Sequence, residues 1–188
     1  MMDLKQGVDF SHDLITEHIN KGAKVIDATV GNGHDTKFLA EVVGAEGFVW
    51  GFDIQDSALE EAKKQLQKDK LLKRVELIYA GHENMQDYIS ETVDGILFNL
   101  GYLPGSDKKV ITTADTTLQA VESGLDLLAR GGLMVVVIYL GHEGGKQEAE
   151  TLLDYAAELD EKKYNVLHYH FINQSSQPPQ VLAIKKRN

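Results

Sequence analysis

The chain has 188 residues, is 43% hydrophobic and contains no Pro/Ser-rich linker or repeat that would divide it, so a single domain, 1–188, with a substantial core is expected. The formal net charge of -10 argues against a protein that coats nucleic acid through bulk electrostatics. Because the sequence lacks cysteine, a signal peptide pattern and any apolar run near the roughly 20 residues of a membrane span, we expect a cytoplasmic protein without disulfides or thiolate zinc sites.

Short apolar runs alternate with amphipathic runs along most of the chain. The short runs are rich in Val, Ile and Phe, which is typical of strands buried on both faces of a parallel sheet. They cover residues 24–28, 47–53, 75–79, 93–100 and 133–140. The intervening runs predict helices over 35–43, 56–68, 84–90, 114–130 and 146–159. This alternation predicts right-handed crossovers and a doubly wound, Rossmann-like α/β fold.

The end of the chain departs from the alternation. Gly131 and Gly132 are expected to stop the helix over 114–130 before the fifth strand. The last two strand candidates, 165–172 and 180–186, are separated only by a polar loop, so they should pair as an antiparallel hairpin. Five parallel strands and such a hairpin resemble the seven-stranded sheet of class I S-adenosylmethionine-dependent methyltransferases. A plain nicotinamide-binding domain lacks the hairpin.

The loop DATVGNG, residues 27–33, joins the first predicted strand to the first predicted helix. It lies at the carboxyl edge, where open α/β sheets bind ligands. Gly31 and Gly33 let the backbone turn sharply and let a ligand come close. A dinucleotide fingerprint requires a third glycine at position 36, where this chain has Thr36. The departure favours a cofactor without a pyrophosphate.

Carboxylates surround this turn. Asp53 ends the second predicted strand, 20 residues after Gly33, where an acidic side chain can accept hydrogen bonds from a ribose. Asp27 and Asp35 suit a ligand's ammonium group and do not suit a phosphate. S-adenosylmethionine has a ribose, an ammonium and a sulfonium but no phosphate, so we expect it to bind here, with Ile54 beside it. A tight turn and a solvated strand end, with no ligand, would be the structural alternative.

The sequence NLGYLPG, residues 99–105, follows the fourth predicted strand. It resembles the Asn-Pro-Pro-Tyr loop of enzymes that methylate exocyclic or amide nitrogens, with Leu100 and Gly101 in place of the prolines. The side-chain oxygen of Asn99 and the backbone carbonyl of Leu100 can hold an attacking amine in line with the methyl group. Tyr102 can stack on a base or face the sulfonium. The alternative is an ordinary turn with a surface tyrosine.

Other polar side chains carry weaker signals. His142, after the fifth predicted strand, can take a proton from an alkylammonium substrate, although helix capping or phosphate binding are alternatives. Lys108 and Lys109 lie beside the NLGYLPG segment, residues 99–105, which we call the acceptor loop. They are the candidate phosphate contacts, although such runs are usually solvated surface. No metal site is predicted, because no histidine pair has a ligand spacing with a carboxylate partner. The histidines expected to be structural or exposed are His12, His34, His168 and His170.

Four motifs in order resemble one family of small bacterial methyltransferases. They are DATVGNGHDTKFLA, GHEN (81–84), NLGYLPG followed by KVITTADTT, and YLGHEGG (139–145). The family was once labelled rRNA methylase and is associated with the last step of making 5-methylaminomethyl-2-thiouridine at the tRNA wobble position. The resemblance therefore implies methyl transfer from S-adenosylmethionine to the amine of 5-aminomethyl-2-thiouridine in tRNA.

The resemblance also implies residue roles. It assigns Asp27, Gly31, Asn32, Gly33 and Asp35 to the methionine end of the cofactor, Asp53 to the ribose, His82 and Glu83 to the adenine, and Asn99 and Tyr102 to the acceptor. Small enzymes of this kind often form homodimers. Methylation of rRNA, DNA or a protein amide stays open as an alternative substrate choice. A nicotinamide-dependent oxidoreductase and a non-catalytic cofactor-binding module are the alternatives from other classes.

Overall fold

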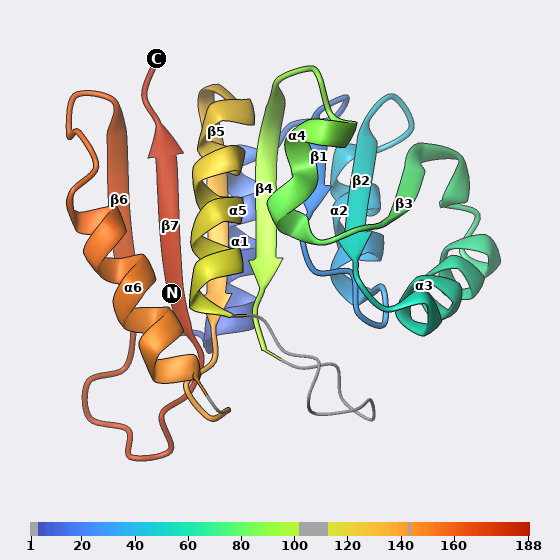
Figure 1. The fold of residues 1–188 in the computed structure, drawn as a ribbon. Coiled ribbons are helices and arrows are strands. Elements are labelled where there is room, and N and C mark those ends of the chain that lie inside the picture. The colour runs from blue at the N-terminus through green and yellow to red at the C-terminus, as the bar shows by residue number, and fades with distance from the viewer. Residues whose placement is uncertain (1–3, 102–112, 143) are drawn as a thin grey trace.

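The computed structural model describes residues 4–101, 113–142 and 144–188 (Figure 1). In these ranges seven strands form one sheet in the order β3-β2-β1-β4-β5-β7-β6. The strands are β1 (Lys24–Asp27), β2 (Phe48–Asp53), β3 (Val75–Tyr79), β4 (Val93–Asn99), β5 (Leu128–Ile138), β6 (Tyr164–Tyr169) and β7 (Gln180–Lys186). Strands β1 to β5 are parallel, and β7 runs antiparallel to both β5 and β6. The predicted doubly wound sheet with its C-terminal antiparallel hairpin is confirmed.

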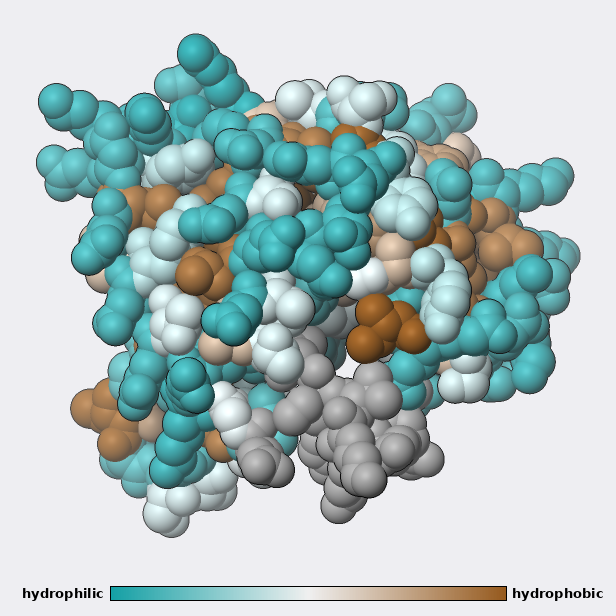
Figure 2. Space-filling view, in the orientation of Figure 1, coloured by the Kyte–Doolittle hydropathy of each residue, from teal (hydrophilic) through white to brown (hydrophobic). Residues whose placement is uncertain are grey.

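Helices cover both faces of the sheet (Figure 1). One layer contains α1 (Gly7–His18), α2 (His34–Val43) and α3 (Asp56–Lys68), and the other contains α4 (Met85–Tyr88), α5 (Ala114–Leu127) and α6 (Gly145–Ala157). Two short 3-10 helices, η1 (Leu72–Arg74) and η2 (His82–Asn84), flank β3. On the face that carries α4 to α6, the surface is mostly hydrophilic, with hydrophobic residues in separate patches (Figure 2).

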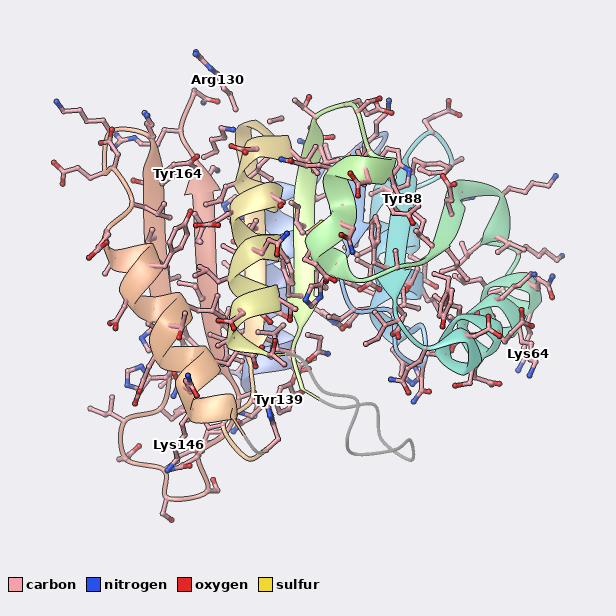
Figure 3. The ribbon with its side chains drawn as sticks, in the orientation of Figure 1. Lys64, Tyr88, Arg130, Tyr139, Lys146 and Tyr164 are labelled. Carbon is pink, nitrogen blue, oxygen red and sulfur yellow. The ribbon has the colours of Figure 1, made fainter. Side chains whose placement is uncertain are left out.

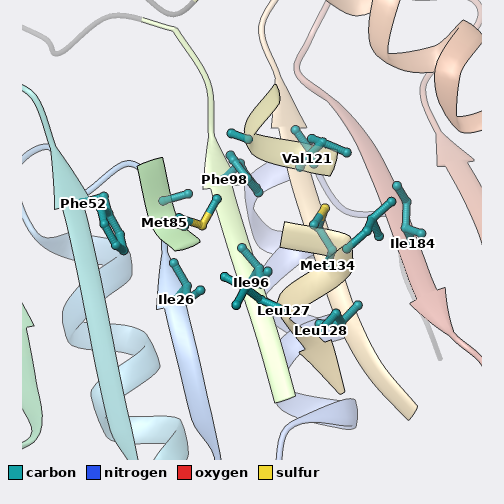
Figure 4. Packing of buried hydrophobic residues seen from close by; sticks show 14 of the residues in the cluster. Ile26, Phe52, Met85, Ile96, Phe98, Val121, Leu127, Leu128, Met134 and Ile184 are labelled. Carbon is teal, nitrogen blue, oxygen red and sulfur yellow. The ribbon is translucent and has the colours of Figure 1, made fainter. Parts of the chain in front are cut away.

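Each central strand is buried on both faces because its alternate side chains enter two different cores. In β4, Ile96 and Phe98 pack in the cluster under α5 (Figure 4), while Leu97 packs with the helices of the other layer. In β5, Met134 and Val135 divide in the same way. This two-sided burial explains the continuous apolar runs from which the strands were predicted.

Several predicted boundaries and one missed helix need correction. The helix α5 ends at Leu127, not at Arg130, and β5 begins at Leu128. The glycines Gly131 and Gly132 therefore lie inside β5, where the pairing with β4 is irregular and Gly131 has a φ of 77°. Glycine adopts the positive φ of this irregular segment without strain. The predicted helix over 84–90 is only α4 preceded by η2, and the strand predicted over 165–172 ends at Tyr169.

Helix α1 has no counterpart in the sequence-based prediction. Its buried apolar contribution is small: Ile15 lies within the helix and Ile19 directly after it. The helix packs against β5 and β7, which are more than 100 residues away in the chain. Because its burial depends on these distant strands, its short polar sequence gives only a weak periodic signal.

Asp27, at the end of β1, ties this strand to α2. Its side chain is fully buried, and its Oδ2 accepts a hydrogen bond of 2.5 Å from Thr36 Oγ1. Its Oδ1 accepts a bond of 3.1 Å from the backbone N–H of Thr29. Burial, and secondarily the charge of Asp35, raise the pKa of Asp27 to about 7. The threonine that replaces the third fingerprint glycine thus holds the loop above it in place.

Gly33 serves the fold in a different way from the sequence-based expectation. It precedes α2 with a φ of 81°, and a Cβ at this position would lie 2.7 Å from the Cβ of Ala62 on α3. The missing side chain therefore makes room for a helix, and does not make room for a ligand. Gly33 is also absent from the described lining of the cavity beside it.

We expect Gly33→Ala to lower the free energy of unfolding by about 2–4 kcal/mol, because a left-handed backbone and a clash with α3 act together. Gly144→Ala is the matched control. Gly144 also precedes a helix, has a φ of 80°, and its Cβ would meet no described atom within 4 Å. Urea unfolding of both variants should show the larger loss at Gly33. Equal losses would contradict the packing of Gly33 against Ala62.

Asp27 should make stability depend on pH. Its folded pKa of about 7 exceeds the ordinary value of 3.8, so between these values the folded state holds a proton that the unfolded chain has lost. Wild-type stability therefore falls as pH rises through this window. Asp27→Asn removes the ionisation, so its stability relative to wild type should rise by roughly 4 kcal/mol from pH 4 to pH 8. Urea unfolding measures both stabilities. If the stability of Asp27→Asn relative to wild type is the same at pH 4 and pH 8, the raised pKa of Asp27 is disproved.

Candidate active site

A cavity of about 580 Å³ opens at the carboxyl edge of the parallel strands. It lies where β1 and β4 are neighbours and their following helices cross to opposite faces, which is the usual ligand site of an open α/β sheet. The volume is in the range of small-molecule sites, roughly 300–1,000 Å³. The described lining comes from the carboxyl ends of the five parallel strands and the segments after them, at 28–32, 34–35, 52–55, 80–83, 99–101, 139 and 141–142, together with the start of α5.

The carboxylate of Asp53 is fixed at one wall of this cavity. Its Oδ2 accepts a bond of 2.8 Å from the backbone N–H of Gly31, and its Oδ1 accepts one of 2.9 Å from that of Gln55. Each oxygen keeps a further lone pair that can accept from a ribose hydroxyl. Ile54, which follows, is 52% exposed and gives the cavity an apolar surface.

The loop after β3 forms the adjoining wall. His82 is buried, its Nδ1 lies 3.2 Å from the backbone carbonyl oxygen of Ala28, and its ring meets Phe98 edge to face. Burial lowers the pKa of His82, so the ring is neutral and donates this bond at neutral pH. Glu83 lines the same wall and accepts a bond of 3.1 Å from Asn84 Nδ2.

Asn99, the last residue of β4, is held at both its backbone and its side chain. Its backbone N–H donates to Thr29 Oγ1 at 2.7 Å, and its Nδ2 donates to Asp35 Oδ2 at 2.9 Å. Since the amide nitrogen is directed to a carboxylate, the side-chain oxygen is the atom left to accept a hydrogen bond from a ligand. The amide therefore has one defined orientation at the cavity.

The two residues after Asn99 continue the same wall. Leu100 buries its side chain and donates its backbone N–H to the carbonyl of Val137 at 2.9 Å. Gly101 has a φ of 130°, and a Cβ there would lie 3.9 Å from Tyr139 and 4.0 Å from the His142 ring. Gly101 therefore lies against the loop that follows β5.

His142 is buried beside a second carboxylate. Its side chain is 5% exposed, and its Nε2 lies 3.7 Å from Glu148 Oε2. Glu148, in the first turn of α6, accepts a bond of 2.6 Å from Thr117 Oγ1 on α5.

Tyr139 lines the cavity together with His142. It lies at the same carboxyl edge of the sheet as Lys146, whereas Arg130 lies at the opposite edge (Figure 3). Burial, and then the charge of Asp35, raise the pKa of Tyr139.

The structure brings most of the sequence-predicted site residues together around this one cavity. Its lining includes Gly31, Asn32, Asp35, Asp53, Ile54, His82, Glu83, Asn99, Leu100, Gly101 and His142. Asp27 and Gly33, at the two ends of the loop over 27–33, are buried and are not part of that described lining. Three further predictions, Tyr102, Lys108 and Lys109, fall outside the described residues.

Several residues at or behind this cavity were not assigned to the site from the sequence. Tyr139 lies within a quoted motif but received no role, and His12 was expected to be structural or exposed. Thr113 and Thr116 also line the cavity. For these two threonines the sequence favours helix capping over a substrate contact, and Thr113 does cap α5 by accepting from the backbone N–H of Thr116. The position of Tyr139 directly after the fifth parallel strand was the signal that could have identified it.

The chemistry of the lining suits S-adenosylmethionine. Among the described lining residues there is no lysine or arginine, so the cavity offers no fixed positive charge for a pyrophosphate. It offers instead the carboxylates of Asp35, Asp53 and Glu83 for hydroxyl, ammonium or sulfonium groups. In the parts of the chain that the structure describes, no cluster of three potential metal ligands occurs, and no helix is long and apolar enough to cross a membrane.

Comparisons with known proteins agree with this site. A family model described as "Putative rRNA methylase" matches residues 49–185. A chloroplastic tRNA (mnm5s2U34)-methyltransferase from Arabidopsis thaliana is 34% identical over 98% of this chain and 71% of its own length. A crystal structure described as a putative rRNA-methylase from Clostridium thermocellum is 44% identical, with a TM-score of 0.96 over 98% of this chain and 100% of the other.

A second solved structure contains the demethylated form of the cofactor. It is described as a putative methyltransferase from Streptococcus mutans in complex with SAH, and is 35% identical with a TM-score of 0.89 over 99% of each chain. The match to the family model covers more than half of the chain, and the relatives align with nearly all of it. The chain therefore belongs to the rRNA-methylase family and is an S-adenosylmethionine-dependent methyltransferase.

Proposed function

We propose that this enzyme methylates the primary amine of 5-aminomethyl-2-thiouridine at the wobble position of tRNA, giving 5-methylaminomethyl-2-thiouridine. The fixed amide of Asn99 carries this assignment, because it places a hydrogen-bond acceptor at the tip of β4. The Arabidopsis relative supports the choice of nucleoside, since its name specifies this product at tRNA position 34.

The proposed transfer needs a neutral amine in line with the methyl donor. S-adenosylmethionine supplies an electrophilic methyl group on its sulfonium. The N–C bond forms as the S–C bond breaks, and the amine, which has lost one proton beforehand, becomes a secondary ammonium. The side-chain oxygen of Asn99 and the carbonyl of Leu100 hold the amine's N–H groups, so that its lone pair faces the methyl carbon.

The RNA itself is proposed to bind through a local patch, because the chain carries a net charge of -10. Lys108 and Lys109 are the proposed phosphate contacts, and Tyr102 is proposed to stack on the wobble base. We further propose a homodimer working in the cytoplasm. The outermost strand, β6, exposes Val166 and Leu167 and gives a dimer a surface to use.

Transfer RNA from cells that lack the enzyme provides the direct test. Incubation of this tRNA with the purified protein and S-adenosylmethionine should convert the aminomethyl nucleoside into its methylaminomethyl form, as measured by mass spectrometry of digested nucleosides. Ribosomal RNA from the same cells serves as the competing substrate, because the family description names rRNA. A methylated rRNA nucleoside with an unchanged wobble nucleoside would overturn the proposal.

We expect Asp53→Ala to weaken S-adenosylmethionine binding by about 1.5–3 kcal/mol, the effect of removing a charged hydrogen-bond acceptor. Titration calorimetry on the folded variant measures this loss. Asp56→Ala is the matched control, because Asp56 is an exposed carboxylate three residues later that does not belong to the described lining. An unchanged affinity in Asp53→Ala would remove Asp53 from the site.

We expect Asn99→Ala to lower kcat by roughly 100-fold or more, which corresponds to about 3 kcal/mol of transition-state stabilisation. Cofactor affinity should change far less, because alignment of the amine matters most at the transition state. Single-turnover rates with saturating cofactor test this. Asn20→Ala, an exposed asparagine before β1 at the opposite edge of the sheet, should leave the rate unchanged. A near-normal rate in Asn99→Ala would refute the acceptor role.

A further inference from the structure

We propose that His12, on α1, is a positioning residue that holds the acceptor amide of Asn99 in its productive orientation through the carboxylate of Asp35. This inference rests on the proposed function in so far as Asn99 receives the amine. It assigns a role in the site to the N-terminal helix, which contributes none of the described lining residues of the cavity.

The imidazole of His12 is fixed by two contacts from α2. Its ring stacks on Phe38, with centroids 3.9 Å apart and planes 13° apart. Its Nε2 lies 2.7 Å from Asp35 Oδ1, a distance typical of a charge-assisted hydrogen bond. Because an ionised carboxylate can only accept, the imidazole is the donor. The stacking thus aims a single N–H at the carboxylate.

Asp35 uses its other oxygen for the acceptor residue. Its Oδ2 accepts from Asn99 Nδ2 at 2.9 Å, so one carboxylate connects α1 to the tip of β4. The backbone of Asn99 is already held by Thr29. The remaining freedom of Asn99 is therefore the rotation of its side-chain amide, and Asp35 restricts that rotation.

The protonation of Asp35 decides which end of the amide faces it. An ionised Asp35 attracts the NH2 group of Asn99, whereas a protonated Asp35 can donate to the oxygen and let the amide turn over. Burial alone would favour the protonated form, but the hydrogen bonds from His12 and then Asn99 outweigh it and lower the pKa of Asp35. Among the groups other than Asn99, His12 therefore contributes most to keeping this carboxylate ionised.

Other charged and titratable groups also act on Asp35, and they come from each neighbouring element. His34, on the same helix, lowers its pKa by its charge. Asp27 on β1 and Tyr139 after β5 each have a pKa raised by the charge of Asp35. Neither of these two groups donates a described hydrogen bond to Asp35, so His12 and Asn99 are the partners that fix its geometry.

The first test compares four variants in the tRNA methylation assay. His12→Leu keeps an apolar side chain against Phe38 and removes the donor, and it should lower kcat roughly 10- to 100-fold with little change in the KM for S-adenosylmethionine. His12→Gln places an amide N–H near the position of Nε2 and should recover most of the rate. The shorter His12→Asn should not. His18→Leu, in the same helix, should behave as wild type, since the described hydrogen bond of His18 Nδ1 is to the carbonyl of Leu14 in α1.

A pH series separates positioning from general loss of structure. Without His12 the pKa of Asp35 should rise, so the defect of His12→Leu should be largest at low pH and shrink as Asp35 ionises. The double variant His12→Leu/Asn99→Ala should be no slower than Asn99→Ala, because His12 acts through Asn99. A defect that is equal at all pH values, or that multiplies with that of Asn99→Ala, would overturn the proposal.

A spectroscopic measurement needs no RNA and keeps this inference separate from the proposed function. The side-chain NH2 resonances of Asn99, assigned by their absence in Asn99→Ala, should shift and exchange faster in His12→Leu and return in His12→Gln. Unchanged resonances would overturn the inference. If they shift as expected while wild type does not methylate the wobble nucleoside, the proposed function fails and the positioning role stands.

Discussion

Three carboxylates lie around one glycine turn, and their mutual repulsion is the constraint that the site has to meet. Like charges at short range in a poorly solvated region cannot all remain ionised without partners. The pKa of Asp27 is raised, and its carboxyl group accepts a hydrogen bond from Thr36. Asp35 meets it by accepting from His12, and Asp53 accepts from two backbone N–H groups. Each carboxylate thus has a different hydrogen-bond partner, and the pKa values of Asp27 and Asp35 shift in opposite directions.

This division of roles explains why the cavity suits a cation. Asp35, whose pKa is lowered, lines the cavity together with Asp53 and Glu83, while Asp27, whose pKa is raised, is fully buried and is not part of the described lining. An ammonium or sulfonium at the cavity offsets the remaining negative charge, and a phosphate would add to it. The departure from the dinucleotide fingerprint therefore has a structural reason, since Thr36 holds the buried Asp27 where a third glycine could not.

The parts of the structure that depend on local pattern were predictable. The parallel strands, the final hairpin, the loop over 27–33 and the acidic end of β2 all followed from apolar runs and short spacings. The boundary between α5 and β5 was not predictable, because an apolar run such as that across Leu127 and Leu128 is compatible with both a helix and a strand. The pairing with β4 determines the conformation there, and Gly131 and Gly132, which resemble a helix stop, lie inside β5 where that pairing is irregular.

Contacts between distant segments were the other part that the sequence could not reveal. His12 and Asp35 are 23 residues apart, and Asp35 and Asn99 are 64 apart, and no local periodicity relates them. The role of Gly33 was hidden for the same reason, because its neighbour Ala62 belongs to another helix.

The N-terminal helix illustrates how such contacts join fold and chemistry. Helix α1 packs on β5 and β7, so the C-terminal hairpin that distinguishes this sheet also supports the helix that carries His12. Asn99, the last residue of β4, pairs with β5. Its side-chain amide donates to Asp35, which in turn accepts from His12 on that same helix. The hairpin is therefore connected to the acceptor residue through packing and two hydrogen bonds, although it contributes no described residue to the cavity. A change at that distant edge has a physical route to the reacting amine.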